Sequence, residues 1–144
     1  MLRTQQDCVF CGITGEGAEA SIVVRTTGVT AFLDRFPVAD GHVLVVPNIH
    51  HSSLAGLPES ISAELWRVAT EILAVIRARL APAVMLHLSD GEAAGQDLDH
   101  VHLHVIPRHP DDAVDVHLPG RKPSRDELDA IASDLARHLA PRKA

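Results

Sequence analysis

The sequence lacks tyrosine altogether, and aromatic residues make up only 3% of its 144 residues. Proteins that bind single-stranded nucleic acids stack bases on such rings and present a basic surface, whereas this chain carries a net charge of −6. No apolar run reaches the ~20 residues of a membrane span, and the polar segment 1–7 lacks the apolar core of a signal peptide. We therefore expect a cytoplasmic protein that binds neither nucleic acid nor membrane.

Cysteine is also scarce, because Cys8 and Cys11 are the only two in the chain. Two cysteines cannot build a disulfide framework, and the Cys-x-x-Cys spacing indicates metal or redox chemistry. A redox pair normally begins a helix in a β-α-β unit, and no such pattern surrounds these residues. Histidine, by contrast, is abundant, with 10 residues, so we look for function among the histidines.

Five short runs bounded by turn residues predict strands. They cover residues 22–25, 29–33, 42–46, 84–88 and 100–106. The first three have turns and no helix between them, which favours an antiparallel meander. Apolar residues recur at helical spacing over 61–80, and Pro82 ends this long helix.

A second helix is predicted at the end of the chain. Ser124 and Glu127 fit a capping box, and the helix that follows runs to about residue 139. The length fits one domain covering 1–144. Strands that are segregated from the helices predict an α+β fold, with a five-stranded antiparallel sheet, one long helix on a face of it and a C-terminal helix.

The segment 100–106 carries the clearest chemical signal. His100, His102 and His104 alternate with apolar residues, so on a strand the three imidazoles share one face and the apolar side chains share the other. Three imidazoles on one face suit two chemistries, which are metal binding and nucleophilic attack on a phosphate. A solvated edge strand is the plain structural alternative.

The loop before these histidines favours phosphate chemistry. Residues 89–99 form a glycine-bearing loop in which Gly95 allows close backbone approach and Gln96 offers an amide donor. Successive backbone N–H groups in such a loop can cradle a phosphate oxygen.

These motifs together resemble the histidine triad (HIT) superfamily, in particular its zinc-bearing bacterial members. The resemblance rests on Gly95-Gln96 followed by the segment 100–108, on 41–47 with the histidines after it, and on the Cys-x-x-Cys segment 8–13. It covers residues 8–108 and leaves a tail, 109–144, without a motif.

The resemblance implies a nucleotide hydrolase or nucleotidyl transferase that attacks the α-phosphate of a nucleoside 5′-phosphate conjugate. His102 would be the nucleophile that forms a covalent nucleotidyl-histidine. His104 would contact the phosphate or the leaving-group bridge, and His42 would support the site. Because loop amides and imidazoles can stabilise the transition state, this chemistry needs no catalytic metal.

The resemblance also assigns the substrate contacts. Gln96 and the backbone around Gly95 and Asp97 would hold the phosphate, and Asp34 would bind the ribose hydroxyls. The base would lie against apolar residues, namely Phe10, Ile13 and Phe32. The expected ligand is a purine nucleotide conjugate with adenosine as the nucleoside.

Two residues depart from the family pattern around the phosphate. Ser89 stands where the phosphoramidase branch has Asn, and Asp97 stands where Ser or Thr is frequent, although bacterial members also carry acids there. A carboxylate beside the phosphate loop repels an anionic substrate, so Asp97 could instead orient a histidine or recognise a cationic leaving group such as an amine. We expect His87 to be an ordinary sheet histidine.

By the same resemblance, Cys8 and Cys11 join His50 and His100 in a structural zinc site. Four protein ligands close the coordination sphere, which is typical of structural zinc. His51 is the rival of His50 as the third ligand. The resemblance further implies a homodimer.

Two other functions remain open from the sequence. The first is a zinc-containing nucleotide-binding module with little turnover, and the departures from the family pattern at Ser89 and Asp97 support this alternative. The second is a zinc hydrolase that uses all three strand histidines as ligands, and it conflicts with the assignment of His100 to the cysteine site.

Overall fold

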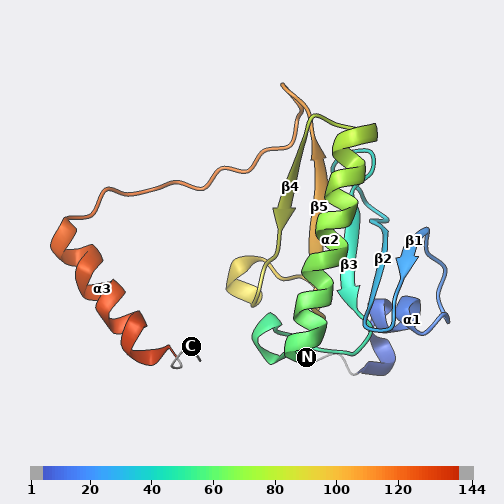
Figure 1. Cartoon of the computed structure of the whole chain (residues 1–144), viewed down its shortest axis with the longest axis horizontal. Coiled ribbons are helices and arrows are strands. Elements are labelled where there is room, and N and C mark those ends of the chain that lie inside the picture. Colours follow the sequence, from blue (N-terminus) through green and yellow to red (C-terminus); the bar gives the residue numbers. More distant parts are fainter. Residues whose placement is uncertain (1–4, 140–144) are drawn as a thin grey trace. The chain divides into compact units, whose positions relative to one another are not determined.

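The computed structural model describes residues 5–139 and divides the chain into two units, Met1–Val114 and Asp115–Ala144 (Figure 1). All the family motifs, from residue 8 to 108, lie in the first unit. The single domain expected over 1–144 stays a prediction, and each unit is described by itself.

The first unit is built on a five-stranded antiparallel sheet. Its strands are β1 (Ile22–Arg25), β2 (Val29–Leu33), β3 (Val43–Pro47), β4 (Ala83–His87) and β5 (Leu103–Arg108). They lie in the order β1-β2-β3-β5-β4, so the meander of the first three strands is confirmed and the last strand in the sequence is inserted beside β3. The predicted α+β sheet is confirmed, and β1 and β4 form its edges.

The last strand begins later than predicted, at Leu103 instead of His100. The backbone N–H of Val101 donates to the carbonyl of His51 at 2.7 Å, so this stretch is bound to the loop after β3 and does not extend the ladder. Val101, Leu103 and Val105 still alternate into one core. His100, His102 and His104 alternate with these residues and therefore still share the other side of the chain.

The helix α2 (Glu59–Arg79) covers one face of the sheet (Figure 1). Its buried residues recur at helical spacing and pack against apolar side chains of β2, β3 and β5. They are Leu65, Val68, Ala69, Ile72 and Ile76. The predicted long helix is confirmed within two residues at its start, and this larger core fixes the sheet from behind the histidines.

The opposite face of the sheet carries a short helix that the sequence patterns did not predict. This helix, α1 (Val9–Thr14), buries Phe10 and Ile13 against Phe32, Leu44 and Val46. Three single-turn 3₁₀ helices complete the first unit, η1 (Gln5–Asp7), η2 (Leu54–Gly56) and η3 (Glu92–Ala94). The smaller core under α1 lies on the same side of the sheet as the histidines.

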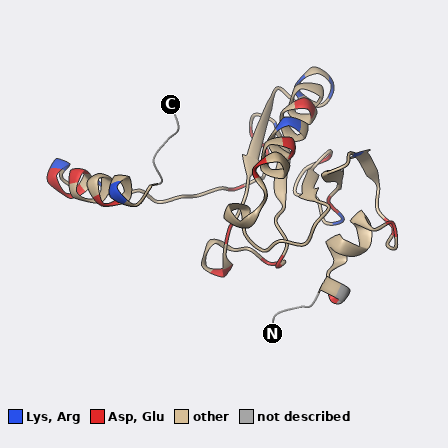
Figure 2. Ribbon diagram, turned by 60° about the horizontal axis from the view of Figure 1, so that its bottom comes forward, with Lys and Arg blue, Asp and Glu red and all other residues tan. Residues whose placement is uncertain are grey.

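The second unit contains α3 (Arg125–His138), which begins with the predicted capping box between Ser124 and Glu127. None of its residues is buried, and Figure 2 shows acidic residues along this helix with a basic residue toward each end. Among the described residues, no helix combines the length and the apolar character that crossing a membrane requires.

The packing of α2 yields a stability prediction. Leu65 is 0% exposed in the core between α2 and the sheet, so Leu65→Ala should lower the free energy of unfolding by about 2–5 kcal/mol through lost burial and a residual cavity. Val75 lies on the same helix and is 60% exposed, so Val75→Ala is the matched control and should change it by less than ~0.5 kcal/mol. Urea denaturation measures both, and equal effects would contradict this packing.

Candidate active site

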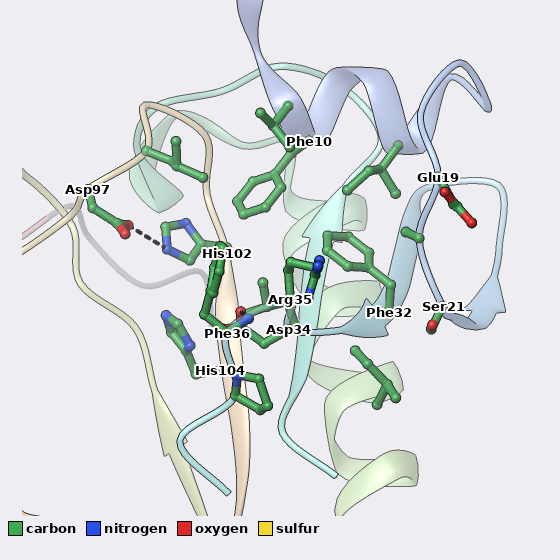
Figure 3. A pocket seen from close by; sticks show the side chains of 17 residues that line it. Phe10, Glu19, Ser21, Phe32, Asp34, Arg35, Phe36, Asp97, His102 and His104 are labelled. Carbon is green, nitrogen blue, oxygen red and sulfur yellow. Dashed lines mark hydrogen bonds and ion pairs between the residues drawn. The ribbon is translucent and has the colours of Figure 1, made fainter. Parts of the chain in front are cut away.

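A cavity of about 1070 Å³ opens on the α1 side of the sheet. One wall is apolar and is built by α1, β2 and β3, through Phe10, Ile13, Phe32 and Leu44. The other wall carries the polar groups His102, His104, Asp34 and Asp97. In Figure 3 the rings of Phe10 and Phe32 lie to one side of the two histidines and Asp97 lies to the other. The structure therefore brings the predicted base pocket and the predicted catalytic histidines together.

His102 presents a defined nitrogen to this cavity. Its Nδ1 lies 2.7 Å from the carbonyl oxygen of His100, and because a carbonyl only accepts, Nδ1 carries the proton. The neutral ring then holds its lone pair on Nε2. The ring is 5% exposed and packs edge-on against Phe10, with ring centroids 5.2 Å apart. A neutral imidazole with its lone pair directed into a cavity has the form that nucleophilic attack requires, and the catalytic role of His102 stays a prediction.

Asp97 lies directly in front of that nitrogen. Its Oδ1 is 3.4 Å from His102 Nε2, and its side chain is 82% exposed. A phosphate that approaches Nε2 must displace the carboxylate, which its exposure allows. Asp97 therefore lies at the approach to Nε2 of His102, and its role toward a histidine or an amine stays a prediction.

A relay of hydrogen bonds sets the tautomers of His42 and His104. The backbone N–H of Val38 donates to Nδ1 of His42 at 3.2 Å, so the proton of the neutral ring lies on Nε2. That Nε2–H donates to Nδ1 of His104 at 2.9 Å. His104 is left with its own proton on Nε2. It can therefore donate a hydrogen bond from Nε2.

Burial keeps both rings of the relay neutral. Desolvation, together with the neighbouring imidazoles of His102, His42 and His87, lowers the pKa of His104 to about 4. Desolvation also lowers the pKa of His42, while the charge of Asp34 opposes this. The neutral forms that the relay requires are thus the stable ones near neutral pH.

Asp34 follows β2 and lines the cavity, as predicted. Its Oδ1 accepts from the backbone N–H of Phe36 at 2.9 Å, and its Oδ2 lies 3.5 Å from His42 Nε2. These contacts hold the carboxylate between the relay and the apolar wall. Its role toward a ribose stays a prediction.

The loop from 89 to 99 is braced by Gln96. The side-chain oxygen of Gln96 accepts from the backbone N–H of Gly91 at 2.7 Å, and its amide donates to the carbonyl of Ser52 at 2.8 Å. Gly95 has a φ of +89°, where a side chain would strain the turn. Gly95 and Gln96 border a second cavity of about 750 Å³, which Asp97 also lines. Their predicted contact with phosphate stays a prediction.

A separate cluster gathers four candidate metal ligands. Cys8, Cys11, His50 and His100 each offer one donor atom, and these atoms lie within 4.8 Å of one another. Cys8 Sγ is 3.5 Å from His100 Nδ1, and Cys11 Sγ is 3.2 Å from His50 Nδ1 and 3.6 Å from His100 Nδ1. Zinc–sulfur bonds of ~2.3 Å and zinc–nitrogen bonds of ~2.0 Å in a tetrahedron imply sulfur–nitrogen edges of about 3.5 Å. The donor set therefore fits a tetrahedral metal ion.

The protonation of this cluster also fits a cation. His100 donates from Nε2 to the carbonyl of Pro47 at 2.9 Å, which leaves Nδ1 free to ligate. Burial lowers the pKa of His100 to about 4, and burial followed by the neighbouring Cys8 thiol raises the pKa of Cys11 to about 11. A bound cation would favour the deprotonated thiolate that ligation requires. Among the described residues, His50 and not His51 belongs to this cluster.

A second set of possible ligands lies in the relay itself, at Asp34, His42 and His104. Here the two imidazoles already share one proton across 2.9 Å. A metal ion would have to replace that hydrogen bond, so the relay is better explained as a hydrogen-bonded pair.

His87 is a histidine of the sheet, as expected, but it is exposed and its ring lies in contact with that of His104. It ends β4 directly opposite His104, and its Nε2 lies 3.1 Å from Ser89 Oγ. The sequence gives no local signal for this, since the pairing of β4 with β5 depends on contacts distant in the chain. Leu44, Arg35 and Phe36, which line the larger cavity, were missed for the same reason.

Comparison with known proteins places this site in a family. The HIT domain family model matches residues 16–111. The Protein hit of Bacillus subtilis is 31% identical over 145 residues, which cover 96% of this chain and 99% of that protein. Adenylylsulfatase HINT3 of Arabidopsis thaliana is 32% identical over 140 residues, which cover 94% of this chain and 71% of that protein.

Solved structures agree with the sequence relatives. A HIT family protein from Bacillus anthracis superposes with a TM-score of 0.88 at 31% identity, covering 95% of this chain and 100% of that one. A histidine triad nucleotide-binding protein from Candida albicans gives 0.82 at 26% identity, covering 91% and 96%. A Zn-bound histidine triad family protein from Mycobacterium smegmatis gives 0.73 at 30% identity, covering 94% and 100%.

The relay predicts a measurable titration. His104 should stay neutral, with its proton on Nε2, down to a midpoint near pH 4, because burial lowers its pKa to about 4 from an ordinary 6.5. Between these two values the unfolded chain binds more protons than the folded one, so the stability contributed by this residue falls as the pH falls through that window. Nitrogen-15 NMR of the imidazoles measures the tautomer and the midpoint, and His104→Gln identifies the signal. A midpoint near 6.5 would contradict the buried relay.

Proposed function

The chain belongs to the HIT domain family, and on this premise we propose that it hydrolyses nucleoside 5′-phosphate conjugates, or transfers their nucleotidyl group, through a covalent intermediate on His102. The observation that carries the proposal is the hydrogen bond from His102 Nδ1 to the His100 carbonyl at 2.7 Å. This bond directs the Nε2 lone pair into a cavity that has an apolar wall on one side and a glycine-bearing loop on the other.

The first half of the reaction is a displacement at the α-phosphorus. The Nε2 lone pair of His102 forms the N–P bond while the bond from phosphorus to the leaving group breaks. His104 donates its Nε2–H to a phosphate oxygen and stabilises the charge that develops there. The His42–His104 hydrogen bond of 2.9 Å holds that donor in place before the substrate arrives.

The second half returns the enzyme to its starting state. Water, or another acceptor, attacks the same phosphorus and the N–P bond to His102 breaks, which restores the lone pair on Nε2. Two displacements through a neutral imidazole have lower barriers than the single direct attack of water on the substrate. The reaction requires no catalytic metal in this scheme.

The apolar wall supports a nucleotide as the substrate. Phe10 and Phe32, whose ring centroids are 5.6 Å apart, and Ile13 offer a surface for a base. Asp34 lies between that wall and the relay, at a place suited to the ribose hydroxyls. We propose adenosine as the nucleoside, in line with the adenylylsulfatase named among the relatives and the nucleotide-binding protein among the structures.

A structural zinc ion at Cys8, Cys11, His50 and His100 forms part of this proposal. The donor geometry supports it, as does the Zn-bound structural neighbour. Bound there, zinc would supply a cross-link between the start of α1, the end of β3 and the approach to β5. Because α1 carries Phe10 and Ile13, this cross-link would hold the apolar wall against His102.

A second candidate function is a nucleotide-binding module with little turnover. It is favoured by Asp97, whose carboxylate lies 3.4 Å from the nucleophilic nitrogen, and by Ser89 at the position of a family Asn. We also propose a homodimer in the cytoplasm. The edge position of β4 and the exposure of Trp66 on α2 support the dimer, and sedimentation equilibrium tests it.

The catalytic proposal makes a direct prediction. The wild-type protein should release AMP from adenosine 5′-phosphoramidate, and His102→Ala should lower kcat/KM by at least about 10³-fold because the nucleophile is lost. Chromatography of AMP follows the reaction, and the cytidine analogue tests the choice of base. His109→Gln is the control, since this exposed histidine lies beyond β5 at the end away from His104. Unchanged release by His102→Ala would refute the nucleophile, and AMP binding without release by the wild type would favour the binding module.

The zinc proposal predicts the metal content and the thermal stability of the protein. Protein purified without chelator should contain about one zinc per chain, and His50→Ala should lose it with a lower Tm because the closed site contributes to folding. His51→Ala is the matched control and should keep both metal and Tm. Elemental analysis and thermal denaturation measure these. Wild-type protein without zinc, or equal losses in the two variants, would contradict the assignment.

A further inference from the structure

A fourth imidazole lies beside His104, which lines the cavity together with His102. His87 ends β4 directly across from His104 on β5, and directly opposed residues of antiparallel strands project to the same face. The ring centroids of His87 and His104 are 5.7 Å apart, comparable to 5.0 Å between His102 and His104. His104 therefore lies in contact with His102 and with His87.

His87 is held so that it can exchange a proton. Its ring is exposed, and its Nε2 lies 3.1 Å from the hydroxyl of Ser89. A hydroxyl donates to a neutral imidazole nitrogen and accepts from a protonated one, so this contact is satisfied in either state of the ring. The Nδ1 edge has no hydrogen-bond partner among residues 5–139, which leaves it for a ligand.

The sheet order places His87 on the leaving-group side of the site. The base wall is formed by α1, β2 and β3, His104 lies on β5, and β4 is the next strand beyond it. Figure 3 shows Phe10 and Phe32 on the side of the histidines that faces away from β4. A conjugate with its base against that wall and its phosphate at His102 thus directs its remaining group toward β4.

The reaction itself requires opposite positions for the nucleophile and the leaving group. In-line displacement at phosphorus places them on opposite sides of the phosphorus atom. His102 lies two residues from His104 along β5, whereas His87 lies across from His104 on β4. No ring contact joins His102 to His87 within the described part of the chain, so a phosphate bound at His102 and His104 leaves His87 available to an atom that departs toward β4.

The other groups around the phosphate are poorly suited to protonate a leaving group. His104 uses Nδ1 in the bond from His42, and burial lowers its pKa to about 4, so its single N–H serves as a hydrogen-bond donor. Asp97 is a carboxylate with 82% of its side chain exposed. An amine leaving group departs slowly as an anion, so the site requires a proton from elsewhere.

We propose that His87 is the general acid that protonates the leaving group, with Ser89 as the residue that positions its ring. This inference rests on the proposed function. As the lone pair of His102 forms the N–P bond, the bond from phosphorus to the leaving nitrogen or oxygen breaks, and that atom takes the proton of the His87 imidazolium. In the second half, neutral His87 accepts a proton from the attacking water as the N–P bond breaks, so both imidazoles return to their initial states.

The proposal predicts a dependence on the leaving group. Adenosine 5′-phosphoramidate loses a poor leaving group that requires a proton, whereas adenosine 5′-(p-nitrophenyl phosphate) loses a phenolate that requires little help. His87→Gln should lower kcat/KM for the phosphoramidate by ~10²–10⁴-fold, which is the usual contribution of a positioned acid. The same variant should change kcat/KM for the nitrophenyl ester by less than about 5-fold.

The experiment compares the wild type, His87→Gln, His87→Ala and the control His109→Gln with both substrates, and measures AMP affinity by calorimetry to verify the fold. If each His87 variant loses more kcat/KM for the phosphoramidate than for the nitrophenyl ester, the proposal is supported. If each variant loses kcat/KM equally for both substrates, His87 has a binding or structural role and the proposal is overturned. Full activity of the His87 variants on both substrates also overturns it. Release of AMP from neither substrate by the wild type overturns the proposed function, and this inference with it.

Discussion

The pairing of β5 along both of its edges is the constraint on which the site depends. On one edge it lies against β3, which brings His104 to His42, and on the other it lies against β4, which brings His104 to His87. The period of two along β5 sends Leu103 and Val105 into the core under α2 and sends the imidazoles to the other face. One strand thus anchors the larger core and carries the reactive groups.

Burial then determines the protonation states that these imidazoles adopt. A buried polar nitrogen without a partner is costly, and none of the described buried side-chain nitrogen or oxygen atoms lacks one. The hydrogen bonds run in two chains, from Val38 through His42 to His104, and separately from His102 to the carbonyl of His100. Each of these hydrogen bonds contains one proton. Each chain admits a single arrangement of neutral tautomers, so the site is preorganised without any charged histidine in the relay.

The candidate metal cluster and the candidate catalytic centre meet at His100. Its imidazole points to Cys8 and Cys11, while its backbone carbonyl fixes the tautomer of His102. Phe10 lies two residues after Cys8 and packs against the rings of both His100 and His102. A metal ion bound at the cluster would therefore stabilise Phe10 and His102 through packing, while remaining outside the cavity where the chemistry is proposed.

Much of this protein is determined by the sequence, because local periodicity and capping depend on neighbouring residues. The period of 3.6 over 61–80, the alternation around His102 and the capping box at Ser124 predicted the long helix, the common side of the histidines and the last helix. The tertiary structure decided the features that depend on contacts distant in the chain. The insertion of β5 between β3 and β4 put His87 beside His104, and packing under α1 built the apolar wall of the cavity. The hydrogen bond from Val101 to His51 set the approach to β5, and His50 rather than His51 lies beside the cysteines. No local pattern encodes these placements, because strand order and the docking of a short helix depend on the burial of apolar surface between segments that are distant in the sequence.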